Sequence, residues 1–171
     1  MSHYSLLAIG YKNEKELADA MAPYSEQLNI DPKWDYYSVE EKSTIGDVKR
    51  MLKEDKENFD PSPHEMVWDK IVNDIEPSTY NAAIFVFLWG KPDRENLIRM
   101  YGTKEKYVEH QRNSGRCSYA VLTDWGWKEP DMVGVVSAFW DAEKEFSETY
   151  FSKFILPYED DTPVYMLDCH I

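Results

Sequence analysis

The sequence contains only two cysteines among its 171 residues, Cys117 and Cys169. They do not form a Cys-x-x-Cys pair, so the sequence offers neither a zinc knuckle nor a dithiol redox motif. A phosphate-binding loop, a His-x-x-x-His metal motif and a nucleophile-elbow serine are also absent. We therefore expect no metal and no cofactor, and the sequence by itself indicates no reaction.

Long apolar runs are missing too. No stretch approaches the roughly 20 apolar residues of a membrane-spanning helix. The apolar segment at residues 5–9 is too short for a signal peptide and lacks a basic flank. Repeats, low-complexity segments and interdomain linkers do not occur. These absences favour a soluble protein of a reducing cytoplasm, with a single domain over residues 1–171.

Positive charge is scarce, because 19 basic side chains face 32 acidic ones and the net charge is −13. This excess repels phosphate, which argues against nucleic acid as a direct ligand and against an anionic membrane surface. A partner protein with a basic surface, or solubility alone, fits the balance. Aromatic residues are abundant at 15%, so some of these rings should lie at the surface, where they favour recognition.

The hydrophobic pattern predicts an α+β fold, in which an antiparallel or mixed sheet is covered by helices. Ferredoxin-like packing is one arrangement left open. Apolar and β-branched segments predict strands at residues 4–11, 82–89, 117–123, 132–138 and 163–170. Helical spacing and capping residues predict helices at residues 13–23, 44–58, 64–75, 93–101, 103–112 and 140–155. Residues 29–43 read as a loop.

That predicted loop carries three adjacent large rings, which either pack as a lid or form a contact surface. Acidic residues follow in the loop and in the next helix, where interspersed lysines also allow an ordinary solvated face. The hypothesis of a contact surface uses nine residues: Trp34, Asp35, Tyr36, Tyr37, Glu40, Glu41, Glu54, Asp55 and Glu57. The turn near residue 125 carries two indoles, which could either bind a cation of a partner by cation–π contact or cap the hydrophobic core. We predict that Trp125 behaves as core and Trp34 as surface.

The closing Asp168-Cys169-His170 is the nearest approach to a reactive cluster. Successive side chains of a strand point to opposite faces, so Cys169 and His170 cannot face each other, whereas Asp168 and His170 can pair. One interpretation is a small enzyme that uses this cluster with a histidine from elsewhere. The other is an inward Cys169 and a pair of polar residues at the rim.

Four features together resemble small proteins encoded by bacteriophages and prophages. They are the N-terminal apolar strand, Ala22-Pro23-Tyr24-Ser25-Glu26, the turn at residues 127–132 and the closing Leu167-Asp168-Cys169-His170-Ile171. The chain departs from that family at Met132-Val133-Gly134, where members have Met-Gly-Trp. It also lacks the paired glycines that follow a Lys-Trp-Asp-Trp element similar to Lys33-Trp34-Asp35-Tyr36. No catalytic residue can be carried over.

The resemblance implies a phage origin and the cytoplasm of a bacterial host. A small acidic phage protein suits the binding and inhibition of a host protein with a basic surface. A defence nuclease such as a CRISPR effector is one such host protein, and the inhibitor would then be anti-defence. The alternatives are the small enzyme described above and an accessory protein of the virion. The oligomeric state is left open.

Overall fold

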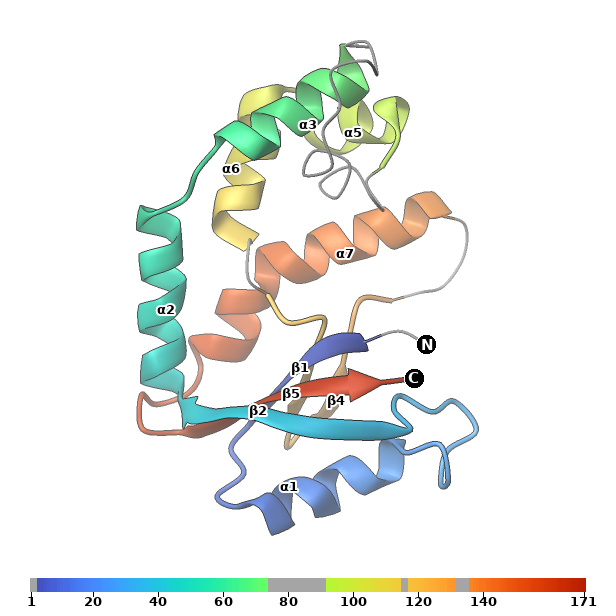
Figure 1. Ribbon diagram of the computed structural model, residues 1–171, viewed down its shortest axis with the longest axis vertical. Helices are drawn as coiled ribbons and strands as arrows, with labels where there is room; N and C mark the ends of the chain where they lie inside the picture. Colours follow the sequence, from blue (N-terminus) through green and yellow to red (C-terminus); the bar gives the residue numbers. More distant parts are fainter. Residues whose placement is uncertain (1–2, 74–91, 115–116, 132–135) are drawn as a thin grey trace. The chain divides into compact units, whose positions relative to one another are not determined.

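The computed structural model describes residues 3–73, 92–114, 117–131 and 136–171 (Figure 1). The chain divides into two compact units. The sheet unit is formed by Met1–Leu52, Arg116–Pro130 and Thr149–Ile171, and the helical unit by Lys53–Gly115 and Asp131–Glu148. The single domain expected over residues 1–171 stays a prediction.

The sheet unit contains a five-stranded mixed sheet in the order β2-β5-β1-β3-β4. Its strands are β1 (His3–Ile9), β2 (Tyr36–Thr44), β3 (Ala120–Thr123), β4 (Gly126–Lys128) and β5 (Pro163–His170). β1 and β3 are parallel, and the other pairings are antiparallel. In a ferredoxin-like sheet another strand splits the first parallel pair, whereas here β1 and β3 pair directly. The predicted α+β class with a mixed sheet is confirmed.

One face of the sheet packs against α1 (Glu14–Met21), which is followed by a 3-10 turn at Ala22–Tyr24. Alternate residues of the strands and two residues of α1 form this core: Leu6, Ala8, Leu17, Met21, Ala120, Leu122, Tyr165, Leu167 and Cys169. On the opposite face Leu7, Ile9, Val121 and Val164 are buried as well. Burying each large apolar side chain contributes about 1.5–3 kcal/mol, so this part of the sheet is stabilised from both faces.

Side-chain caps start three helices where the sequence predicts them. Asn13 Oδ1 accepts the amide of Glu16 at 3.0 Å at the start of α1. Thr44 Oγ1 accepts the amide of Asp47 at 3.3 Å before α2 (Ile45–Glu57). Before α5 (Arg94–Tyr101), Asp93 caps the first turn in the same way. Such caps satisfy amides that have no partner within the helix.

The helical unit contains α3 (Ser62–Val72), α5, α6 (Lys104–Ser114) and most of α7 (Val136–Tyr150). Its core consists of Val67, Trp68, Leu97 and Tyr107. α3 begins two residues earlier than predicted because Pro63 is tolerated in the first turn, where its missing N–H has no helical acceptor. Beyond Tyr150 the helix continues as a π-helical turn at Phe151–Ile155 in the sheet unit.

Two predictions of secondary structure are wrong. Residues 29–43 are not all loop, since Tyr36–Thr44 form strand β2, whose polar sequence is stabilised by its ladder with β5. The strand predicted at residues 132–138 is also incorrect, because Val136 begins α7 and the hairpin partner of β3 is β4. The hydrophobic pattern of a short apolar run does not distinguish a strand from a buried helix. Residues 132–135 and the strand predicted at 82–89 lie outside the described residues.

Candidate functional site

Polar side chains of three neighbouring strands gather at one end of the sheet, on the face opposite α1. The ladders place His3, His170 and Tyr36 directly across from one another, and Ser5, Asp168 and Ser38 form the next row. Residues two apart on a strand share a face. We call these six residues the polar end of the sheet. The apolar residues of the same face lie farther along the strands.

Two histidine–aspartate pairs organise the polar end. The Nδ1 atom of His170 lies 2.7 Å from Asp35 Oδ1, and the Nδ1 atom of His3 lies 2.9 Å from Asp168 Oδ2. The two imidazole rings meet edge to face with their centroids 5.0 Å apart. His170 has 13% of its side chain exposed and His3 has 57%. This arrangement places two imidazoles beside two carboxylates at one end of the sheet.

The predicted Asp168-Cys169-His170 cluster does not assemble. Asp168 pairs with His3 and His170 pairs with Asp35, so the two residues do not pair with each other as the sequence allowed. Cys169 is fully buried in the core against α1, as its inward interpretation predicts. Burial raises the pKa of its thiol to about 12. Cys169 therefore does not supply the accessible thiolate that the enzyme hypothesis requires.

The four residues of the predicted aromatic contact split into two inward and two outward side chains. Trp34 and Tyr37 pack against the core with their rings edge to face at 4.9 Å. Asp35 is exposed, and Tyr36 has 54% of its surface exposed. The alternation of a strand explains the split at residues 36 and 37. Only the outward pair is available to a partner.

The predicted roles of the two tryptophans are reversed. Trp34 is half-buried, and its Nε1 atom donates to the carbonyl of Met21 at 3.1 Å. Trp125 is 80% exposed at the tip of the β3–β4 hairpin. The next ring, Trp127, is the one that packs, because its indole lies 5.2 Å from the ring of Tyr24 and donates to Glu129 at 2.8 Å. The pairing of β4 with β3 decided that Trp127, and not Trp125, faces the core.

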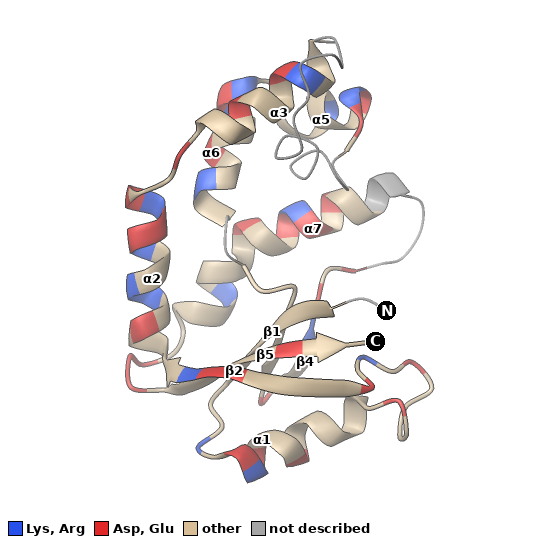
Figure 2. Ribbon diagram, viewed as in Figure 1, with Lys and Arg blue, Asp and Glu red and all other residues tan. Residues whose placement is uncertain are grey.

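Glu40 and Glu41 are exposed in the second half of β2. Figure 2 shows an acidic stretch in this strand, next to a basic one. In the part of the chain that the structure describes, neither forms an ion pair, although Glu40 accepts a hydrogen bond from Ser38 at 2.7 Å. The only basic residue of β2, Lys42, does not pair with either glutamate. Its Nζ atom lies 5.2 Å from the ring centroid of Tyr165, on the α1 face, and 3.4 Å from a backbone carbonyl.

The remaining three predicted contact residues, Glu54, Asp55 and Glu57, lie in the last turns of α2, within the helical unit. Glu54 and Glu57 are exposed, and Glu57 is 3.8 Å from Lys53. This mixture of charges is the solvated helix face that the lysines of the sequence allow. These residues belong to a different unit from Asp35 to Glu41, so the nine candidates are not one described surface.

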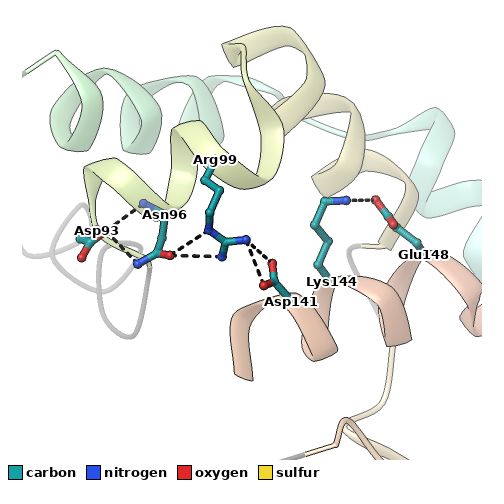
Figure 3. Close-up of polar contacts among 6 residues, drawn as sticks. All are labelled: Asp93, Asn96, Arg99, Asp141, Lys144 and Glu148. Atoms are coloured by element: carbon teal, nitrogen blue, oxygen red, sulfur yellow. Dashed lines mark hydrogen bonds and ion pairs between the residues drawn. The ribbon is translucent and has the colours of Figure 1, made fainter. Parts of the chain in front are cut away.

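Polar residues within the helical unit join α5 to α7 (Figure 3). The guanidinium of Arg99 contacts both carboxylate oxygens of Asp141, at 2.8 and 2.9 Å, and also reaches Asn96. One turn farther along α7, Lys144 pairs with Glu148 at 2.6 Å. Sequence reasoning missed this network, because nothing in the local pattern shows which carboxylate an arginine meets. A single guanidinium nitrogen contacts both carboxylate oxygens, and this charged pair ties the two helices together.

We predict that Trp34→Ala lowers the free energy of unfolding by about 2–3 kcal/mol, somewhat less than the loss for a fully buried ring. The exposed Trp125→Ala serves as the matched control and should change stability by no more than about 0.5 kcal/mol. Urea unfolding of both variants measures the difference. A destabilised Trp125→Ala together with an unchanged Trp34→Ala would contradict the described packing.

Both cysteines should resist alkylation in the native protein. Burial raises the pKa of Cys117 and of Cys169 to about 12. At pH 8 only about one thiol in ten thousand is then ionised, and the thiolate is the reactive form. Iodoacetamide labelling followed by mass spectrometry should be slow in buffer and fast in urea. Rapid native labelling of Cys169 would revive the enzyme hypothesis.

The Asp35 carboxylate should make stability depend on pH. The hydrogen bond with His170 lowers the pKa of Asp35. A lowered pKa in the folded state stabilises the fold above the ordinary value of about 3.9, and this contribution is lost as pH falls through the folded pKa. The unfolding free energy of the wild type should therefore fall more steeply than that of Asp35→Asn between about pH 5 and pH 3. Equal slopes in urea titrations would contradict the pairing.

Among the described residues, no group of three or more His, Cys, Asp or Glu side chains has an arrangement that could hold a metal ion. No helix in these same ranges is long and apolar enough to cross a membrane. No family model, curated protein or solved structure matches the chain.

Proposed function

We propose that this chain is an acidic interaction protein of the phage type, which binds a basic surface of a host protein and inhibits it. A defence nuclease, such as a CRISPR effector, is the class of host protein that such a surface suits. One observation carries the proposal. Asp35, Tyr36, Glu40 and Glu41 are all exposed along one stretch of the sheet unit.

The charge of the stretch supports a basic partner. Neither Glu40 nor Glu41 has an ion-pair partner among the described residues, and the basic residue beside them is turned toward Tyr165. Their charge is therefore available to an incoming cation. The net charge of −13 adds a long-range field that accelerates association with a basic protein and weakens with salt.

The apolar part of the stretch supports contact rather than mere solubility. Tyr36 is 54% exposed and Val39 is 39% exposed, between carboxylates on either side. A tyrosine ring supplies a large contact area at a small entropic cost, and such rings are enriched at interaction hot spots.

The test is affinity capture from the lysate of a host bacterium at about 0.05 M salt, followed by elution at about 0.5 M. A retained protein should be basic, and its own activity should fall when the purified chain is added. Glu40→Lys combined with Glu41→Lys should weaken the purified complex by about tenfold or more. The matched control, Glu159→Lys with Asp161→Lys, makes the same change of charge at exposed residues before β5.

The control should alter affinity by about threefold or less at the same salt. Equal losses in the two double variants would show that net charge alone holds the complex and that the stretch is not a contact. No salt-sensitive partner at low salt, or a partner whose activity is unchanged, would overturn the proposed function. Recovery of the chain in purified phage particles would favour the virion accessory instead.

A further inference from the structure

We propose that the outer edge of β2 accepts an extended basic segment of the partner as an additional strand of the sheet. This inference rests on the proposed function and specifies how the partner is bound. In this mode backbone hydrogen bonds supply affinity, and the side chains of alternate residues supply specificity. It requires an unpaired edge of sufficient length, a reason that the edge does not pair with itself, and a pattern that selects the guest strand.

Within the part of the chain that the structure describes, the outer edge of β2 is long and unpaired. β2 spans nine residues, Tyr36–Thr44, and is the terminal strand of the sheet order. Its inner side forms the ladder with β5. In the described ranges no backbone–backbone hydrogen bond reaches β2 from any other segment. An exposed row of amides and carbonyls of this length is a template for another strand.

The charge of the edge excludes one class of guest and favours another. Proteins commonly protect an edge with lysine, proline or a bulge. β2 has a bulge between Val39 and Glu41 but contains no proline, and Lys42 lies over the Tyr165 ring. The charges left along the edge are those of Glu40 and Glu41. They repel a second copy of this acidic chain and attract a basic strand.

The register between β2 and β5 predicts which residues the added strand should carry and how far apart they stand. Tyr36, Ser38 and Glu41 share the face opposite α1, across from His170, Asp168 and Met166 of β5. The β5 residues are two apart, so a regular guest strand beside β2 needs the same spacing. A basic residue opposite Glu41 and an apolar residue opposite Tyr36 then stand four positions apart on the guest. Opposite charges and aromatic–aliphatic pairs are the cross-strand contacts that stabilise sheets.

The experiment uses the full chain and synthetic peptides of about nine residues, the length of a long strand. In the probe, threonine alternates with residues whose side chains would lie on the face opposite α1. Two of these residues, four positions apart, are arginine and isoleucine. One control peptide replaces arginine with glutamate. A second keeps every side chain but is N-methylated at alternate residues, which removes the amide donors on one edge. Binding is followed by titration calorimetry, and hydrogen exchange maps the amides that become protected.

The probe should bind, and exchange should slow by about tenfold or more at alternate amides of β2. The glutamate peptide and the N-methylated peptide should each bind at least about tenfold more weakly. Glu41→Lys should reverse the preference between the arginine and glutamate peptides. The Glu159→Lys, Asp161→Lys control should keep the wild-type preference.

Three results would overturn the inference. They are equal binding of the N-methylated peptide, binding without protection of β2, and a concentration-dependent dimer of the chain that protects the β2 amides. Hydrogen exchange of β2 in the complex with the captured host protein distinguishes failure of this inference from failure of the proposed function. If that protein binds in a salt-sensitive way while β2 exchange is unchanged, the function stands and strand addition fails. If neither the peptide nor any host protein binds, both fail.

Discussion

The antiparallel ladder between β1 and β5 is the interaction on which the rest of the sheet unit depends. It joins seven consecutive residue pairs, from His3 opposite His170 to Ile9 opposite Val164. The two strands lie side by side in Figure 1, although more than 150 residues separate them in the sequence. Closing so long a loop costs little more than closing a short one, because the entropic cost grows only logarithmically with length. Once β5 is placed, its other edge orders β2, whose sequence would not form a stable strand by itself.

The same ladder explains why polar groups can occupy the end of an otherwise buried sheet. The imidazoles and carboxylates of β1, of β5 and of Asp35 just before β2 lie side by side, and each imidazole has a carboxylate within hydrogen-bonding distance. A buried or half-buried polar group is tolerated when it has such a partner. The opposite face needs no such arrangement, since α1 covers apolar residues there. The sheet therefore has one largely apolar face and one face that changes from apolar to polar along the strands.

Three of the five large rings in the predicted contact segment and in the β3–β4 hairpin pack against the core. Trp34, Tyr37 and Trp127 lie against the core, whereas Tyr36 and Trp125 are exposed. The surface available to a partner is therefore narrower than the aromatic content suggests. In the proposed binding mode, the recognition elements are a short run of carboxylates, one ring and a backbone edge that is unpaired in the described ranges. Such an edge binds by geometry that many sequences share, and the carboxylates supply the selectivity.

The sequence by itself determined the features that depend on neighbours within a few residues. Asn13, Thr44 and Asp93 start helices because a side-chain oxygen reaches an amide three residues ahead. The buried strands β1 and β5 followed from their apolar content, and Cys169 was correctly placed facing inward by alternation. The exposed residues Glu40 and Glu41 were also found from sequence, but only as part of a presumed loop.

Tertiary structure alone decided the strand at Tyr36–Thr44, the helical start at Val136 and the choice of Trp34 over Trp125 as the inward indole. It also decided that His170 meets Asp35 and His3 meets Asp168. Each of these outcomes depends on a partner far away in the chain. Local propensity is too weak to choose among such partners, because the free energy comes from ladders and packing that exist only after the distant segments meet.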